Sequence, residues 1–228
     1  MKFETFKKSV QLSKEDICRD LLAQNRDRIK IKKEKVAVKN LVRILDAALS
    51  ISNQKGFASM SLRDLSSEAG LSMGALYSYI SSKEELLDMM QQQGRSLIVK
   101  ILGEYLGDIN DPLEKLKRGI QVHLYLSEVM QPWFYFSYME TKNLPKEVHK
   151  KSIEAELYTE QIFTEIIEAG IKEGRFRKSN PQMVSAALKA LLQDWYLKRW
   201  KYERRKVSVE AYAEFIMDLV SSYLMAKE

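Results

Sequence analysis

Apolar residues recur every three or four positions along most of the chain, which is the spacing of helices that bury one face. The clearest run starts at Lys39 and continues to Ile51, and Gly56 is well suited to end it. No stretch alternates apolar and polar residues as a β-strand does. The pattern therefore predicts an all-α protein.

Helix-start signals divide the chain further. Serine caps, two of them followed three positions later by an acidic residue, predict three successive starts at Ser61 with Asp64, at Ser72, and at Ser82 with Glu85. Later helices are expected from Pro112, from Pro145, from Pro181 to about 203, and from about 208 to 226. These signals indicate a basic N-terminal extension at residues 1–38, a three-helix head at 39–87 and a helical bundle at 88–228.

The segment AGLS, residues 69–72, joins two short expected helices. Ala69 and Gly70 are small enough to let the backbones approach, and Leu71 would fill the angle between the helices. This arrangement is typical of a helix-turn-helix, which places its second helix in the major groove of DNA. An ordinary corner between two packed helices is the alternative.

The second of these helices, SMGALYSYI, carries no acidic residue, whereas both neighbours have acidic residues in their first turns. Acidic side chains normally stabilise the positive end of a helix, so their absence suits a helix that lies against phosphates. Gly74 and Ala75 are small enough for close approach to a groove wall. Tyr77 and Tyr79 offer hydroxyls for phosphate and rings for thymine methyls, and core packing is the alternative for Tyr79.

The run ILDAALSISNQKGFASMSLRDLSSEAGLSMGALYSYISSKEELL, residues 44–87, resembles the DNA-binding domain of the TetR family of transcriptional regulators. The resemblance includes the KGF turn, the S-x-R-D-L helix start and the G-x-LY-x-Y-x-x-x-KEEL end. It implies a homodimer, more commonly a repressor than an activator in this family, that binds palindromic operator DNA and is released by a small-molecule effector. The DNA-binding residues that it implies are Ser61, Arg63, Ser72, Met73, Gly74, Ala75, Tyr77, Tyr79 and Lys83.

Two positions depart from the family pattern. Met73 stands where the family often has Lys or Arg, and Ile80 stands where Phe is usual and looks like a core substitution. The extension before residue 39 is also longer than is typical. A basic arm there would supply phosphate or minor-groove contacts and so partly replace what Met73 lacks.

The net charge of +6 suits a polyanionic partner only weakly, but its distribution is informative. Residues 1–40 contain 12 Lys and Arg against 6 Asp and Glu, which equals the whole net charge. A solvated basic tail and a nucleic-acid contact are both compatible with this segment. The single cysteine, Cys18, and the absence of a signal-peptide pattern lead us to expect a cytoplasmic protein.

The last two expected helices each present an apolar face, and the resemblance implies that they pair with their symmetry mates in a dimer. The residues expected at this interface are Val184, Leu188, Leu191, Tyr212, Phe215, Ile216, Leu219 and Tyr223. Burial within one chain is the alternative for this face.

Aromatic residues gather between about 98 and 200, where the effector pocket is expected because such pockets are mostly apolar with a few polar anchors. The candidate ligand-binding residues are Tyr105, Gln121, His123, Tyr125, Trp133, Phe136, Glu140, Phe163, Gln193 and Trp195. The bundle, with DWYLKRWKYERR near its end, resembles family members that sense acyl-CoA or other long hydrophobic molecules. A plain aromatic core is the alternative.

Other classes of protein find less support in the sequence. The two histidines, His123 and His149, form no metal-binding pattern, and there is no G-x-S-x-G or phosphate loop. We therefore expect no enzyme, no catalytic residue, no metal and no cofactor. A constitutive DNA-binding protein, or a membrane-surface protein that uses the basic extension, remains the alternative, although no stretch is apolar enough for a membrane span.

Overall fold

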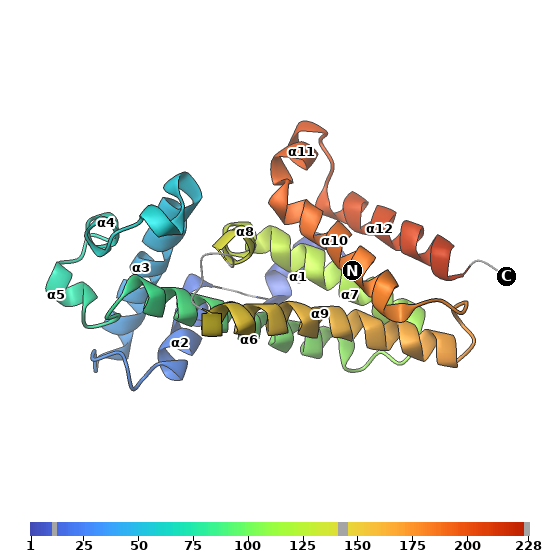
Figure 1. Cartoon of the computed structure of the whole chain (residues 1–228), viewed down its shortest axis with the longest axis horizontal. Coiled ribbons are helices and arrows are strands. Elements are labelled where there is room, and N and C mark those ends of the chain that lie inside the picture. The colour runs from blue at the N-terminus through green and yellow to red at the C-terminus, as the bar shows by residue number, and fades with distance from the viewer. Residues whose placement is uncertain (11–12, 141–145, 226–228) are drawn as a thin grey trace. The chain divides into compact units, whose positions relative to one another are not determined.

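The computed structural model describes residues 1–10, 13–140 and 146–225, and within these residues all regular structure is helical (Figure 1). The predicted all-α fold is therefore confirmed. The helices are α1 (Phe3–Val10), α2 (Lys14–Gln24), α3 (Glu34–Lys55), η1 (Phe57–Ser59), α4 (Leu62–Glu68), α5 (Met73–Leu76), α6 (Lys83–Leu106), α7 (Pro112–Val129), α8 (Gln131–Glu140), α9 (Lys146–Lys172), α10 (Pro181–Leu197), α11 (Arg199–Arg204) and α12 (Val209–Leu224). The expected helix start at Pro145 and the expected helix end at 226 lie outside the described residues.

The chain folds into two compact units. The head unit comprises Gln11–Ser96 and Pro132–Ser152, and the body unit comprises Met1–Val10, Leu97–Gln131 and Ile153–Glu228. The head unit therefore includes α8 residues that follow a long stretch of the body in the sequence.

Local capping explains where the head helices begin. The Ser61 hydroxyl accepts the Asp64 N–H at 3.1 Å and the Asp64 carboxylate accepts the Ser61 N–H at 2.9 Å, so this capping box is complete. At the start of α6, the Ser82 hydroxyl accepts the Glu85 N–H, whereas the Glu85 carboxylate accepts the N–H and O–H of Ser81 instead. Both helix starts lie where the sequence predicts them. At the second start, the Glu85 carboxylate bonds to Ser81 and not to the expected Ser82.

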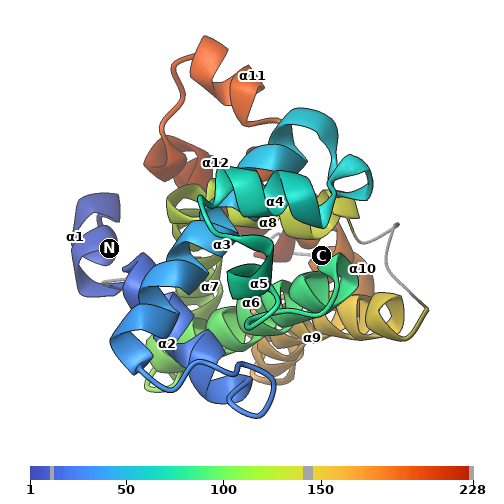
Figure 2. The ribbon, with the colours of Figure 1, turned by 90° about the vertical axis from the view of Figure 1, so that its left-hand side faces the viewer.

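Two helices, α1 and α2, lie in the N-terminal extension. In the head unit, α2 runs along α3 (Figure 2) and buries Ile17, Leu21 and Leu22. Cys18 is also buried there, at 1% exposure, and burial raises the pKa of its thiol to about 12. The first part of the extension, α1, packs on α7 in the body unit.

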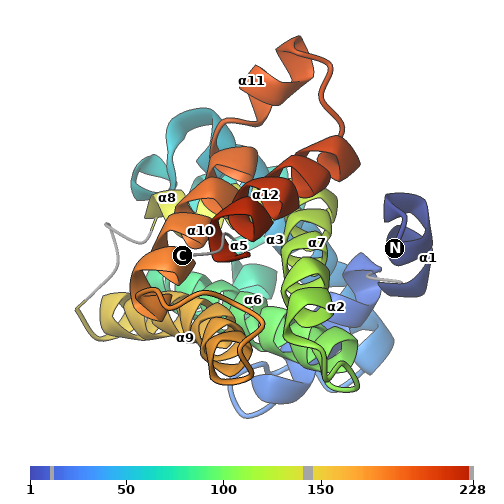
Figure 3. The same cartoon turned by 90° about the vertical axis from the view of Figure 1, so that its right-hand side faces the viewer.

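In the body unit, α10 and α12 lie beside one another and both contact α7 (Figure 3). The expected helix at 181–203 is split at Lys198 into α10 and α11. The chain turns there so that the Tyr202 ring packs on Trp195, with ring centroids 4.8 Å apart, while Tyr212 of α12 stacks on Trp195 at 5.1 Å. None of the helices in the described part of the chain is long and apolar enough to cross a bilayer.

Candidate nucleic-acid interface

A sharp turn between α4 and α5 sets the direction of the second helix. Gly70 has φ +60°, a conformation that side chains with a Cβ rarely adopt. The Arg43 guanidinium of α3 donates to the Gly70 carbonyl at 2.6 Å, and a Cβ added at Gly70 would lie 2.5 Å from the Arg43 Nη2 atom. The turn is therefore held from α3 by a residue that the sequence pattern did not single out, because nothing local connects Arg43 to a turn 27 positions away.

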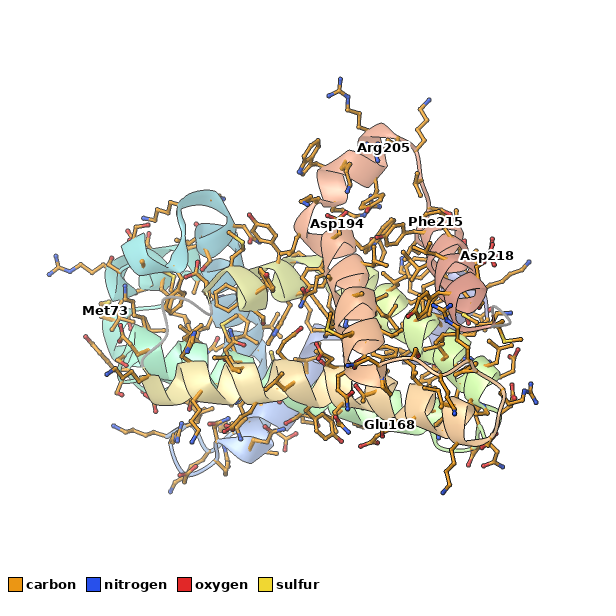
Figure 4. All side chains as sticks on the ribbon, turned by 45° about the vertical axis from the view of Figure 1, so that its right-hand side comes forward. Met73, Glu168, Asp194, Arg205, Phe215 and Asp218 are labelled. Atoms are coloured by element: carbon orange, nitrogen blue, oxygen red, sulfur yellow. The ribbon has the colours of Figure 1, made fainter. Side chains whose placement is uncertain are left out.

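The predicted DNA-binding residues include a group whose side chains or Cα atoms are open to solvent. Ser61, Arg63, Ser72, Gly74 and Tyr77 are exposed, the last to 49%. Met73, labelled in Figure 4, and Ala75 are half-buried. A Cβ added at Gly74 would meet no atom within 4 Å, so its smallness has no packing reason inside the described head.

Beneath this exposed group, apolar side chains of the head are buried. Met60, Leu65, Leu76 and Ile80 are all at most 2% exposed, and the burial of Ile80 agrees with its expected core role. A rigid base is what a recognition surface needs, because side chains can then be presented in one arrangement.

The structure corrects the prediction for Tyr79. Its side chain is only 1% exposed, and its hydroxyl accepts a hydrogen bond from Asn40 of α3 at 3.0 Å. The reason is that α5 ends at Leu76, so the following turn rotates Tyr79 toward the head interior. Burial raises the pKa of this phenol. Tyr79 is a core residue, and the core alternative was the right one.

Lys83 lies partly buried at the start of α6, where it stabilises the end of η1. Its ammonium donates to the carbonyls of Ala58 at 2.7 Å and Met60 at 3.2 Å, and it lies over the Phe57 ring. These contacts explain a cation at a helix N-terminus without a phosphate. Lys83 holds the segment that leads into α4, and this differs from the free phosphate clamp expected from the sequence.

The basic segment between α2 and α3 is attached to the end of the helix-turn-helix. The Lys30 N–H donates to the Ser78 carbonyl at 2.9 Å, and the Arg26 guanidinium donates to the carbonyls of Ile31 and Lys32 at 2.7 and 2.9 Å. The side chains of Lys30, Lys32 and Lys33 are exposed. We call residues 26–33 the basic loop. The basic loop is therefore attached to the segment that follows α5 through the backbone of Lys30.

Comparison with known proteins identifies the family. A family model described as "Bacterial regulatory proteins, tetR family" matches residues 44–90, and one described as "Tetracyclin repressor-like, C-terminal domain" matches residues 110–224. The chain belongs to the TetR family. It is accordingly a helix-turn-helix transcriptional regulator.

Individual TetR-family proteins resemble the chain over most of its length. The HTH-type transcriptional regulator HbdR of Aromatoleum sp. is 21% identical over 81% of this chain and 80% of its own. The crystal structure of PfmR from Thermus thermophilus is similar with a TM-score of 0.67 at 26% identity, covering 82% of this chain and 99% of that one. FadR from Bacillus subtilis in complex with stearoyl-CoA has a TM-score of 0.65 at 19% identity, covering 80% and 98%.

The outer sides of α10 and α12 carry exposed apolar residues, with exposed Glu214 and Asp218 beside them on α12. On α10, Met183, Ala187 and Ala190 are exposed, and on α12, Phe215 (Figure 4) and Leu219 are exposed to 59% and 47%. Among the other predicted interface residues, Val184 and Leu191 are half-buried and Tyr223 is 45% exposed, with Arg177 over its ring.

Three predicted interface residues point the other way. Leu188, Tyr212 and Ile216 are at most 6% exposed and belong to the interior of the body unit. They lie one helical step from the exposed residues, so they occupy the inward face of the same helices. This corrects their assignment to the outer face.

The predicted effector residues do not form one group. Trp133, Phe136 and Glu140 lie in the head unit, where Phe136 packs on Phe57 and the Glu140 carboxylate accepts the Phe57 N–H at 3.1 Å. These contacts give Phe136 and Glu140 partners inside the head unit, and their role in effector binding stays a prediction.

Others have structural partners in the body unit. Tyr105 and Tyr125 are covered by α1, and Gln121 is 9% exposed on the same helix as Tyr125. Trp195 is fully buried, with its N–H donating to Glu128 at 3.0 Å, and Phe163 is fully buried as well.

His123 and Gln193 belong to a buried polar group between α7, α9 and α10. The Lys189 ammonium, 5% exposed, donates to the Thr159 hydroxyl at 2.8 Å and lies 3.4 Å from Glu156, which also accepts from Gln193. Burial, and then the charge of Lys189, hold the pKa of His123 well below its usual range. Burial likewise lowers the pKa of Lys189. The sequence signal that could have found Lys189 is a single cation inside the apolar run SAALKALL.

Proposed function

We propose that this TetR-family chain is a ligand-responsive repressor that binds palindromic operator DNA as a homodimer and is released by a small hydrophobic effector, with acyl-CoA as the first candidate. The observation that carries the DNA-binding part is the exposed group Ser61, Arg63, Ser72, Gly74 and Tyr77 on a closely packed head. These side chains are polar, small or aromatic, which suits contacts to phosphates and base edges.

Selection of bound sites from random duplex DNA tests this proposal directly. A palindromic consensus whose half-sites are about 10 base pairs apart, or a multiple of that, is expected from a two-fold dimer. Failure to enrich any sequence at low salt would contradict the proposal.

A matched pair of tyrosine variants then locates the contact. Tyr77 and Tyr158 are exposed to 49% and 50%, in the head and body units respectively. Tyr77→Phe removes a hydroxyl from the proposed interface and should weaken operator binding about threefold to tenfold, the usual cost of one hydrogen bond. Tyr158→Phe should leave binding unchanged, and equal effects of the two variants would place the interface elsewhere.

The basic loop provides a second, electrostatic contribution in this proposal. Exposed Lys30, Lys32 and Lys33 stand on the segment whose backbone is bonded to Ser78, directly after α5. Changing all three to Ala should flatten the dependence of log affinity on log salt by up to about 0.9 for each phosphate that the loop no longer neutralises. This triple change leaves the buried residues of α2 unaltered, so it isolates the charge of the loop. An unchanged salt slope would show that the loop stays in solvent.

A second copy of the chain is the proposed partner of the apolar outer faces of α10 and α12. The small residues Ala187 and Ala190 on α10 permit close helix approach, and Phe215 and Leu219 supply apolar area on α12. Leu219→Glu should shift the protein to a monomer in sedimentation velocity and abolish operator binding. Leu157→Glu, at a 56% exposed leucine of α9, is the control and should do neither.

The effector proposal draws on the names of relatives and on the buried polar group. FadR of Bacillus subtilis was solved with stearoyl-CoA, and the "Fatty acid metabolism regulator protein" of the same species is 24% identical over 71% of this chain. Lys189, Thr159 and Gln193 offer donors that would hold the polar end of a mostly apolar molecule. Stearoyl-CoA should release the selected duplex, and Lys189→Met should reduce that release. Tight binding of stearoyl-CoA without any change in DNA affinity would contradict ligand control.

A further inference from the structure

The two N-terminal helices stand apart from the shared TetR fold. The family models match residues 44–90 and 110–224, so α1 and α2 lie outside both. Helices this short are marginal by themselves in water, so each depends on what it packs against. The two consecutive helices pack against different units of the molecule.

The first helix, α1, is seated on the body. The Phe6 side chain is fully buried, with its ring centroid 5.4 Å from that of Tyr105 on α6 and 5.7 Å from that of Tyr125 on α7. The Phe3 ring packs edge-on against Tyr125 at 5.3 Å, and the Phe3 N–H donates to the Glu210 carboxylate of α12 at 3.0 Å. Three body helices therefore contribute to one docking surface.

The second helix, α2, is seated on the head. Its buried residues Ile17, Leu21 and Leu22 face α3, and an exposed ion pair joins Lys14 to Asp46 of α3 at 2.7 Å. The Ser13 hydroxyl caps α2 by accepting the Asp16 N–H. α2 thus packs on α3, the helix from which Arg43 holds the turn at Gly70.

Only a short stretch of chain separates α1 from α2. Val10 ends α1 and Ser13 caps α2, so three peptide units separate them and span at most about 11 Å. At its other end, the head continues into α6, whose last residues belong to the body unit. When α1 is docked, it therefore adds a connection at the N-terminal end of the head to those that the chain already makes within α6, at the start of α8 and within α9.

We propose that α1 and α2 form a strap that anchors the N-terminal end of the DNA-binding head to the body and thereby limits the orientations that the head samples. The strap prepares the head for the operator, because the apparent affinity is proportional to the fraction of molecules whose head is oriented to bind. The DNA part rests on the proposed function. The anchoring part stands on the packing of α1 and α2 alone.

The test compares two substitutions in α1. Phe6→Ala empties the docking surface, whereas Thr5→Ala changes an exposed, uncharged neighbour and is the matched control. Neither alters charge, so a missing phosphate interaction cannot account for a difference between them. Phe6→Ala should speed amide hydrogen exchange in α1 and α2 and weaken binding to the selected duplex about tenfold, with the same salt slope as the unaltered chain. Thr5→Ala should match the unaltered chain in both measurements.

The two measurements separate the strap from the proposed function. If the unaltered chain binds no duplex, the repressor proposal fails and hydrogen exchange still decides whether docking of α1 protects α2. Unchanged exchange in α2 for a folded Phe6→Ala protein overturns the strap, as does an unchanged or higher affinity. If Phe6→Ala fails to fold, Phe6→Leu serves as the second variant, because it removes the ring contacts with Tyr105 and Tyr125 without altering charge, and the same outcomes apply to it.

Discussion

The helix-turn-helix of the head and the polar group around Lys189 in the body differ in whether their polar side chains are exposed or buried. In the head, Ser72 and Tyr77 are exposed, while the apolar side chains of Leu65 in α4 and Leu76 in α5 are buried. In the body, Lys189, Thr159 and His123 are buried between helices, and the outer sides of α10 and α12 carry exposed apolar residues. In the proposed function, the polar side chains on the head surface meet DNA, whereas the polar group around Lys189 is held inside the body.

This difference has an energetic side. An exposed polar residue can be exchanged at little cost to stability, so changes on the head surface report on DNA binding. A buried cation or imidazole is tied to the packing around it, so changes in the body affect stability and effector response together. The following expectations test that contrast.

The largest effect on stability is expected at Gly70, in the turn between α4 and α5, and a matched glycine in the body is the control. Gly70 and Gly174 have φ +60° and +69°, but an added Cβ meets Arg43 at Gly70 and no atom within 4 Å at Gly174. Gly70→Ala should cost about 2–3 kcal/mol of unfolding free energy because it adds a clash to the left-handed strain, against about 1 kcal/mol for Gly174→Ala. Urea denaturation measures both. Equal costs would show that Arg43 yields freely.

The body should show its own pH dependence. Since the pKa of His123 lies well below its usual range in the folded state, the unfolded chain takes up a proton below about pH 6.5 that the folded chain does not. The unfolding free energy should therefore fall as the pH drops below about 6.5, by up to about 1.4 kcal/mol per pH unit from this group. His123→Gln should flatten that slope in urea titrations from about pH 7 to about pH 5. An identical slope in the variant would mean that other groups cause it.

Gly74 should separate stability from binding. It and Gly103 of α6 both have open space at the Cβ position. Replacing either with Ala should raise the unfolding free energy by about 0.5–1 kcal/mol, since Ala loses less backbone entropy on folding. Only Gly74→Ala should weaken operator binding, about tenfold, by adding a methyl group at the proposed groove contact. Unimpaired DNA binding would remove Gly74 from the interface.

The smallest effect is expected at Met73. Met73→Lys adds a cation beside the proposed contact and should tighten binding a few-fold, with a salt slope steeper by about 0.9 for one added phosphate contact. Met225→Lys adds the same charge at a residue of the body that is 49% exposed, and it should leave the slope unchanged. If the two variants behave alike, Met73 does not lie near DNA.

The sequence predicted best what depends on neighbouring residues. The caps at Ser61, Ser72 and Ser82 all accept the N–H three residues further on, because a cap involves residues within one turn. The head was also accessible through its resemblance to the TetR family over residues 44–87. The DNA-contact roles themselves stay predictions.

What failed depends on packing between distant segments. The Tyr79 hydroxyl accepts a hydrogen bond from Asn40 in the interior of the head. The Glu140 carboxylate accepts the N–H of Phe57, which lies 83 positions away in the sequence. The same limit applies to Leu188 and Ile216, since apolar helix faces alone do not show which of two adjacent faces is covered. Long-range partners of this kind have no local sequence signal.

The burial of Cys18 makes the reactivity of its thiol a measure of how often α2 separates from α3. It is the only thiol in the chain, it lies on the buried face of α2 at 1% exposure, and its pKa of about 12 leaves almost no thiolate at neutral pH. A thiol reagent can therefore react only during the moments when α2 lifts from α3. The rate of that reaction, measured on the unaltered protein with and without DNA, counts these openings without any added probe.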